Sequence, residues 1–256
     1  MSGDDGEGEG VLARAVRMLR AFDDGEEAHT ATSLAARTGL ARSTAHRLAV
    51  ELAALGLLDR RPDGSYAIGT GLWELGELAP VSLRLRERAL PHLARLYEVS
   101  GENVHLAVLS TPDPALAEAL YVGRVTGPNS IPTLSRMGGR HPLHTTGVGK
   151  ALLAVQDEAW LDVFLARTLE RETVHSVTDA RQLRAELAVA RERGYATTRQ
   201  EMTLGNVSVA AALAPVAGLP PAAVGVVTHL ARADERRLAR LVVAAARSIV
   251  RDLARP

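Results

Sequence analysis

Short polar and basic side chains cluster in residues 42–47, which read RSTAHR. Such side chains hydrogen-bond to base edges in the major groove of DNA, and arginines also bind phosphates. Helical spacing over residues 41–55 places an apolar stripe on the opposite face, formed by Ala45, Leu48, Ala49, Leu52 and Leu55. The outer face then carries the candidate DNA-contacting residues Arg42, Ser43, Thr44, His46 and Arg47. An ordinary solvated helix face is the alternative.

A short helix and a tight turn precede this segment. Thr32 is the predicted N-cap of a helix through Thr38, and Gly39 stands where a positive φ is needed to end it. Two helices joined this closely are typical of a helix-turn-helix. The same geometry also occurs in folds that do not bind DNA.

A charged hairpin follows the second helix. Leu57 and Leu58 lead into a polar turn over residues 59–64, and residues 65–68 return as a strand. Arg60 and Arg61 would lie on this ribbon, where guanidinium groups contact phosphates or enter the minor groove. A solvated hairpin is the alternative, but the order of helix, turn, helix and hairpin favours a DNA-binding winged helix.

The chain resembles the IclR family of bacterial transcription regulators along nearly its whole length. The resemblance lies in residues 11–22, in TGLARSTAHRL at 38–48, in GRHPLHTTGVGKA at 139–151, and in RERGY at 191–195 followed by Glu201 and Gly205. It implies an α+β protein with an N-terminal winged helix-turn-helix, a linker helix and a C-terminal effector-binding domain related to GAF and PAS folds. It also implies a small-molecule metabolite effector, and it favours a repressor over an activator.

Length and composition agree with a two-domain protein, and we expect no cofactor. The 256 residues are 46% hydrophobic, enough for two cores. No apolar run has the length of a membrane span and no secretory signal opens the chain, so we expect a cytoplasmic protein without a membrane partner. The absence of cysteine excludes disulfides and a cysteine nucleophile.

The formal net charge is zero, although DNA affinity depends on neutralising phosphates. The charge is unevenly distributed, because an acidic tail at residues 1–10 is set against arginines in the winged helix at positions 37, 42, 47, 60 and 61. This basic patch is modest. We therefore expect weak DNA binding by one subunit, and useful affinity from a homodimer on a near-palindromic double-stranded operator. The resemblance favours a dimer of dimers, a homotetramer, on DNA.

The predicted domains are a disordered tail at 1–10, a winged helix at 11–70, a linker helix at 71–90 and an effector-binding domain at 91–256. In the linker, Leu72, Trp73 and Leu75 pack either against a partner's winged helix or on their own domain. Pro80 interrupts the helical pattern, which resumes over residues 83–97 around Pro91.

Strands and helices alternate in the C-terminal part. Expected strands are 102–109, 119–125, 195–199, 207–213 and 224–229, and expected helices are 147–154, 157–166, 179–193 and 234–253, the last with a basic outer face. This pattern indicates an antiparallel sheet with helices on one face and loops over the other. Such a fold offers an internal pocket for a small molecule.

The segment TTGVGK at residues 145–150 is the predicted floor of that pocket. Its hydroxyls, glycines and free amides at a helix start can hold an anion. Lys150 is the only lysine in the chain, which suggests a need for a compact ammonium group, although chance explains it equally well. His144 and Ala151 stand where a P-loop needs Gly and Ser or Thr, so nucleoside triphosphate binding at this segment is disfavoured.

The resemblance also implies which residues line the effector cavity: Gly147, Val148, Thr198, Ser208, Val226 and Thr228. Many relatives have an acid at the position of Thr198, a cysteine at that of Ser208, and small hydroxyl residues at those of Val226 and Thr228. These differences predict a less polar pocket, and a ligand other than the small keto acids that some relatives sense.

Three alternatives to a ligand-responsive regulator stay open: a metal site, a hydrolase, and a C-terminal domain used only for oligomerisation. His105, His141, His144 and His229 lack the tight spacing of a zinc motif, so no metal is expected. His144 and Ser208 suggest a hydrolase, but no serine lies in a Gly-x-Ser-x-Gly elbow, so we expect no enzyme. A C-terminal domain that serves only oligomerisation would lack an enclosed cavity beside Gly147 and Ser208.

Overall fold

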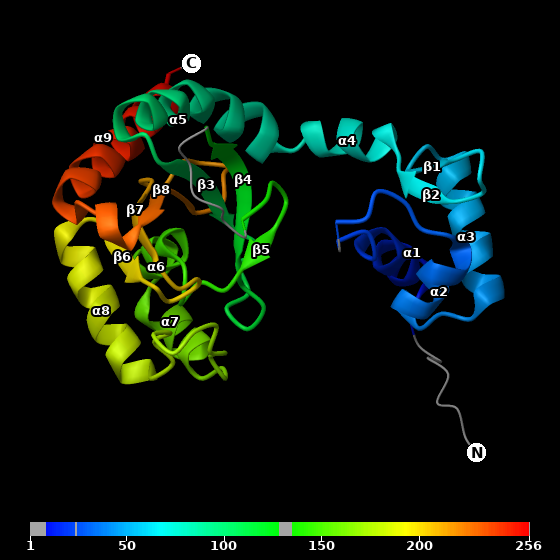
Figure 1. Cartoon of the computed structure of the whole chain (residues 1–256), viewed down its shortest axis with the longest axis horizontal. Coiled ribbons are helices and arrows are strands. Elements are labelled where there is room, and N and C mark those ends of the chain that lie inside the picture. Colours follow the sequence, from blue (N-terminus) through cyan, green and yellow to red (C-terminus); the bar gives the residue numbers. More distant parts are fainter. Residues whose placement is uncertain (1–8, 24, 128–134, 256) are drawn as a thin grey trace. The chain divides into compact units, whose positions relative to one another are not determined.

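A computed structural model describes residues 9–23, 25–127 and 135–255 (Figure 1). The chain forms two compact units, Met1–Ala79 and Pro80–Pro256, which divide inside the predicted linker. Residues 1–8 of the predicted acidic tail lie outside the described residues. No helix within the described residues combines the length and apolarity needed to cross a membrane.

The N-terminal unit is the expected winged helix. Its elements are α1 (Val11–Arg20), α2 (Ala31–Thr38), α3 (Arg42–Ala54), β1 (Leu58–Arg60), β2 (Tyr66–Ile68) and α4 (Thr70–Glu77). Met18, Leu34, Leu48, Leu58 and Tyr66 are at most 2% exposed and form the centre of its core. These side chains come from all three leading helices and the hairpin, so burial of one small core fixes how α3 and the hairpin lie together.

Two predicted positions in this unit are wrong. Helix α2 begins earlier than expected, because Thr30 and not Thr32 is its N-cap and accepts a 3.1 Å hydrogen bond from Ser33 N. Leu55 is 71% exposed because α3 ends at Ala54 and the chain turns away at Gly56. The predicted helix stop at Gly39 is confirmed, with φ +68°.

The hairpin is held by its polar turn. β1 and β2 pair antiparallel, with Arg60 opposite Tyr66. Asp63 Oδ1 accepts hydrogen bonds from Ser65 N at 2.9 Å and Ser65 Oγ at 2.7 Å, and these bonds lower the pKa of the Asp63 carboxyl. Gly64 takes φ +82° to close the turn. The predicted hairpin is therefore present, and hydrogen bonds within its own turn stabilise it.

The C-terminal unit has the expected α+β content. Its elements are η1 (a π-helix, Val81–Arg86), α5 (Glu87–Ser100), β3 (Asn103–Leu109), β4 (Ala119–Val125), β5 (Arg140–His141), α6 (Gly147–Ala154), α7 (Glu158–Leu165), α8 (Ala180–Arg193), β6 (Ala196–Arg199), β7 (Asn206–Ala212), β8 (Ala222–His229), η2 (Leu230–Arg232) and α9 (Glu235–Leu253). The helix expected from residue 83 thus starts as a π-helix and continues through Ser100.

One six-stranded antiparallel sheet organises this unit, in the order β5-β4-β3-β8-β7-β6. α5 and α9 pack on one face, and α6, α7 and α8 lie on the other (Figure 1). The expectation of helices on a single face is therefore wrong. Because both faces are covered, the central strands are almost wholly buried, and alternate residues of a strand belong to two separate cores.

Candidate DNA-binding surface and ligand cavity

The outer face of α3 is polar, basic and open to solvent. Arg42, Ser43, His46 and Arg47 are exposed, and Thr44 is half-buried near the helix start. The opposite face supplies Ala45, Leu48, Ala49 and Leu52 to the core. The fold thus directs the candidate residues away from the protein, as contact with a DNA groove requires.

Two of the candidate arginines are engaged by carboxylates. Arg47 Nη1 lies 3.1 Å from Glu51 Oε1 one turn along α3, and Arg61 Nη2 lies 3.3 Å from Glu27 Oε2. Both pairs are exposed, so each is weak and can be exchanged for a phosphate. Arg42 and Arg60 make no ion pair with the described residues.

Helix α4 carries large apolar side chains on its surface. Trp73 is 67% exposed, Leu75 59% and Leu78 68%. Leu72, one position away, is half-buried. None of the three exposed side chains packs in the core of its own unit, so this apolar surface is available to a partner.

A cavity of about 60 Å³ lies between the sheet and the segment that opens α6. It is lined by His105, Tyr121, Ser135, His141, Thr145, Thr146, Gly147, Thr198, Glu201, Met202, Thr203, Asn206, Val207, Ser208 and Val227. Three of the six predicted effector residues, Gly147, Thr198 and Ser208, are in this set. The described lining contains no arginine or lysine, and Glu201 is its only carboxylate.

Strand register explains which residues reach the cavity. Thr198, Ser208 and Val227 stand opposite one another across β6, β7 and β8, so they share one face of the sheet. Val226 lies on the other face, in the core beneath α5 and α9. Thr228 is two residues further along β8 and therefore points to the same face as Val226. Val226 and Thr228 therefore do not line this cavity, whereas Val227 does, because one residue along a strand reverses the face.

Val148 also lies outside the lining. It is 3% exposed and packs in the core between α6 and the sheet. A Cβ built on Gly225 of β8 would lie 3.0 Å from Val148 Cγ1, so a glycine in the strand lets α6 approach. Val148 therefore supports the cavity wall from behind.

Gly147 is where the helix and the sheet come closest. A Cβ at this position would lie 2.3 Å from Ser208 Oγ, well inside van der Waals contact. Thr146 caps the helix by accepting a 3.2 Å hydrogen bond from Gly149 N. Gly147 is therefore required for the close packing of α6 on β7, a reason other than the predicted approach of an anion.

Lys150, the only lysine in the chain, lies outside the lining of this cavity and is buried in an ion-pair network. Its side chain is 2% exposed, and its Nζ lies 2.6 Å from Glu186 Oε2 and 2.7 Å from Glu201 Oε2. Glu201 contributes to the cavity wall, whereas Glu186 projects from α8. Burial raises the pKa of Glu201, and the charge of Lys150 opposes this rise only in part.

The aromatic side of the cavity is held uncharged. Burial lowers the pKa of His105 to about 3, with smaller contributions from the charges of Arg124 and His141. Burial likewise raises the pKa of the Tyr121 hydroxyl, which hydrogen-bonds to Thr146. Tyr121 stacks edge-on against His105 and His141, with centroid distances of 5.3 Å. A neutral histidine and a phenol therefore face the cavity at physiological pH.

Tyr121 was not among the predicted residues, although alternation in β4 gives a partial signal. A bulge between Leu106 and Ala107 changes the register, so that Tyr121 pairs with Ala107 and Gly123 pairs with Leu106. Tyr121 and Gly123 consequently fall on opposite faces. Simple alternation therefore cannot predict which face of the sheet each β4 side chain occupies.

The other two candidate histidines, His144 and His229, make separate local hydrogen bonds. His144 Nε2 bonds to the carbonyl of Glu170 at 2.8 Å, and His229 Nδ1 accepts a bond from Ala231 N. Within residues 9–23, 25–127 and 135–255, no group of three or more metal-ligating side chains is placed to hold an ion.

Both units match known protein families. Residues 11–62 match the IclR helix-turn-helix domain, and residues 79–255 match the bacterial transcriptional regulator IclR C-terminal domain. The HTH-type transcriptional regulator XynR of Escherichia coli is 30% identical over 89% of each chain. The glycerol operon regulatory protein of Streptomyces coelicolor is 33% identical over 94% of this chain and 95% of the relative.

Solved structures agree with these matches over both units. An IclR homolog from Microbacterium hydrocarbonoxydans complexed with 4-hydroxybenzoate has a TM-score of 0.87 and 33% identity, covering 95% of this chain and 99% of its own. A putative transcriptional regulator from Rhodococcus sp. RHA1 has a TM-score of 0.79 and 31% identity, covering 95% and 98%. The chain therefore belongs to the IclR family of bacterial transcriptional regulators and is a DNA-binding regulator rather than an enzyme.

Proposed function

We propose that this regulator is a homo-oligomeric repressor whose binding to a near-palindromic operator is controlled by a small molecule in the cavity beside α6. The observation that carries the proposal is the cavity lined by Gly147, Thr198 and Ser208, in a unit separate from the DNA-contacting helix. Such a cavity disfavours a C-terminal unit that serves only oligomerisation, since that role needs no ligand space. The site of action is the bacterial cytoplasm, where the chromosome lies.

On the DNA side, α3 enters a major groove. Arg42, Ser43, Thr44, His46 and Arg47 supply the base and phosphate contacts, and Arg60 and Arg61 contact the flanking backbone. Binding replaces the exposed pairs of Arg47 with Glu51 and of Arg61 with Glu27 by charge-assisted bonds to phosphate.

Oligomer formation follows from two features. A single winged helix with this few arginines binds DNA weakly, so two half-sites are needed for affinity. The exposed apolar side chains Trp73, Leu75 and Leu78 offer a surface whose burial stabilises a homodimer. A homotetramer formed from two such dimers is the larger assembly that we propose on DNA.

The effector is a small, largely apolar molecule that can also hydrogen-bond. The space of about 60 Å³ has aromatic walls from Tyr121 and His141 and hydroxyls from Thr145, Thr198 and Ser208. The similar protein from Microbacterium hydrocarbonoxydans was crystallised with 4-hydroxybenzoate, a single-ring compound. We take 4-hydroxybenzoate as the first effector to test.

The effector acts through its unequal affinity for two arrangements of the oligomer. Only this difference in affinity changes operator binding, and such coupling is typically about 1–3 kcal/mol. If the effector favours the arrangement with poor DNA affinity, it relieves repression.

Fluorescence anisotropy tests this proposal. The purified full chain is titrated on DNA from its own upstream region and on an unrelated duplex, at 50 and 200 mM NaCl, between which the Debye length falls about twofold. We expect tighter binding to its own upstream region, and a change in affinity when 4-hydroxybenzoate or another single-ring acid is added. Equal, salt-sensitive binding to both duplexes would contradict a specific operator in that region, and no binding at either salt would contradict the DNA-contacting surface.

A further inference from the structure

A second concave surface lies where the end of α8 and the residue before β6 face helix α9. This groove, here called the arginine groove, has a volume of about 460 Å³ and is lined by Arg193, Tyr195, Arg236, Ala239, Arg240, Val243, Ala244 and Arg247. Four of the eight lining residues are arginines, and none is acidic. It shares no residue with the cavity beside α6.

Helix α9 supplies three of these arginines in one row. Arg236, Arg240 and Arg247 are spaced by four and seven residues, so they lie on one side of the helix and span about 16 Å along it. The small side chains Ala239, Val243 and Ala244 lie between them and form an apolar floor. The basic outer face expected for this helix is thus concentrated at one groove.

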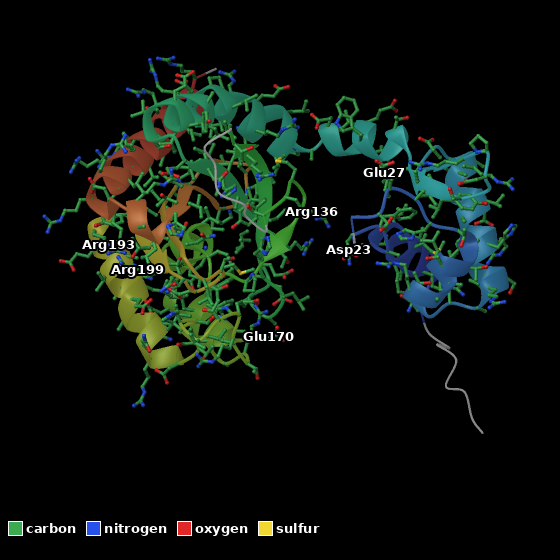
Figure 2. All side chains as sticks on the ribbon, viewed as in Figure 1. Asp23, Glu27, Arg136, Glu170, Arg193 and Arg199 are labelled. Atoms are coloured by element: carbon green, nitrogen blue, oxygen red, sulfur yellow. The ribbon has the colours of Figure 1, made fainter. Side chains whose placement is uncertain are left out.

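The fourth arginine is fixed at the other wall. Arg193 Nε donates to the Tyr195 carbonyl at 2.7 Å, its Nη2 donates to Thr197 Oγ1 at 2.9 Å, and its guanidinium lies 4.2 Å from the Tyr195 ring centroid. Figure 2 shows Arg193 and Arg199 on the side of the unit where α8 and α9 meet. Arg193 is therefore held in place before any ligand binds.

The positive charge of the groove is not balanced from within the described chain. Arg236, Arg240 and Arg247 make no hydrogen bond or ion pair with any described residue, whereas neighbouring Arg199 pairs with Glu235 and Arg237 bonds to the Val99 carbonyl. Four like charges around one hollow repel one another unless an anion lies between them. The groove therefore favours a ligand with several negative charges.

We infer that the arginine groove binds a nucleotide carrying a di- or triphosphate group. Guanidinium groups match phosphate oxygens with paired hydrogen bonds, and several arginines suit a chain of phosphates better than a single carboxylate. The apolar floor of Ala239 and Val243 and the edge of Tyr195 suit the uncharged part of such a molecule. The concave shape of the groove favours a small ligand. The backbone of duplex DNA needs no such hollow, because it can bind arginines on a flat or convex surface.

This inference is independent of the proposed effector cavity and operator contacts. It gives the regulator a second input, by which the nucleotide supply of the cell is sensed apart from the small-molecule effector. The binding free energy comes mainly from charge, so it weakens as salt rises.

Isothermal titration calorimetry on the full chain in 50 mM NaCl tests the inference, with ATP, GTP and inorganic pyrophosphate as probes and adenosine as the uncharged control. We expect dissociation constants below about 1 mM for at least one triphosphate and no binding of adenosine. The double variant Arg236→Gln, Arg240→Gln should lose at least about tenfold in affinity, since two charge-assisted contacts are removed. Arg251→Gln is the matched control, because Arg251 lies on the same helix outside the groove and bonds to Ser248.

Each other outcome overturns the inference. If the wild-type chain binds none of the phosphate probes at 50 mM NaCl, the groove is not a nucleotide site. If Arg251→Gln loses as much affinity as the double variant, binding is nonspecific attraction to the helix. If no probe binds but the double variant weakens operator binding or changes the sedimentation coefficient, the groove contacts DNA or a second copy of the chain.

Discussion

Replacing Lys150 by Met should strongly destabilise the C-terminal unit, although the substitution keeps the length and apolar bulk of the side chain. Lys150 is 2% exposed and is paired with Glu201, which is 7% exposed. Met leaves the Glu201 carboxylate buried beside the cavity without its cation. Breaking a buried ion pair in this way costs about 3–5 kcal/mol.

The magnitude can be converted to a melting shift. In a domain of 150–250 residues, 1 kcal/mol corresponds to about 2–4 °C, so the expected shift is roughly 6–20 °C. Glu186→Gln is the matched control, because it removes the other partner of Lys150 but its side chain is 38% exposed. We expect this control to cost less than about 1 kcal/mol.

Tryptophan fluorescence during urea denaturation measures the effect. The chain has two tryptophans, Trp73 in α4 and Trp160 in α7, so a Trp73→Phe background makes the signal specific to the C-terminal unit. Trp160 suits this purpose because its indole N–H bonds to the Pro112 carbonyl at 2.8 Å in the native state.

The effect of Lys150→Met depends on pH with a definite sign. The folded pKa of Glu201 is raised above its ordinary value of 4.5, so the folded state holds the proton to higher pH than the unfolded chain. The stability of the unit therefore falls as pH rises through this window. The substitution to Met removes the cation that opposes the rise in the Glu201 pKa, and so raises this pKa further. The destabilisation is therefore largest at neutral pH, where Glu201 must be charged, and it shrinks as pH falls toward 4.5 and the carboxyl takes up a proton.

Two results would refute this reasoning. A loss below about 1 kcal/mol at pH 7, or a loss that stays constant between pH 7 and 5, would mean that Glu201 finds solvent or another partner. Conversely, adding Glu201→Gln to Lys150→Met should restore part of the lost stability, since a neutral amide replaces the unpaired charge.

Four further predictions follow from the geometry. Arg47→Ala should weaken operator binding by about 1–3 kcal/mol in anisotropy titrations without changing the melting temperature; unaltered affinity would remove Arg47 from the DNA contacts. Gly147→Ala should destabilise the unit by about 1–3 kcal/mol in urea, because its Cβ would lie 2.3 Å from Ser208 Oγ. Ser208→Trp should fill the cavity and abolish the effector response of operator binding, and a full response would place the effector elsewhere. His105, whose folded pKa is about 3 against 6.5 ordinarily, disfavours the folded state as pH falls below 6.5; His105→Gln should therefore lose less stability than wild type between pH 7 and 5.

Local sequence patterns correctly predicted those helices and strands whose bounds are determined by neighbouring residues in the chain. The helices after Asp157, Asp179 and Asp234 begin as expected, because each aspartate accepts a hydrogen bond from the backbone three residues on. Strand β4 also matches its expected bounds, since its apolar run is flanked by Glu118 and Thr126, and helix α6 begins as expected after the N-cap Thr146. Capping and periodicity are local, so one sequence suffices to find them.

Long-range pairing could not be predicted in the same way. The partners of Lys150 lie 36 and 51 residues away, and only the packing of α6 on α8 and on the loop after β6 brings them together. The faces on which Val226 and Thr228 lie likewise depend on strand register, which the pairing of Ser208 with Val227 sets. A covered second face of the sheet also could not be foreseen, because continuous apolar strands fit several arrangements of helices.

The division of the sheet into two cores has a consequence for building biosensors from this protein. Thr198, Ser208 and Val227 face the cavity in which we propose that the effector binds, while residues such as Val209 and Val226 hold α5 and α9 on the reverse side. A library randomised at the first three positions would vary ligand preference while leaving the second core intact. Selection for new ligands can thus proceed with little loss of folded protein, provided that Gly147 is kept.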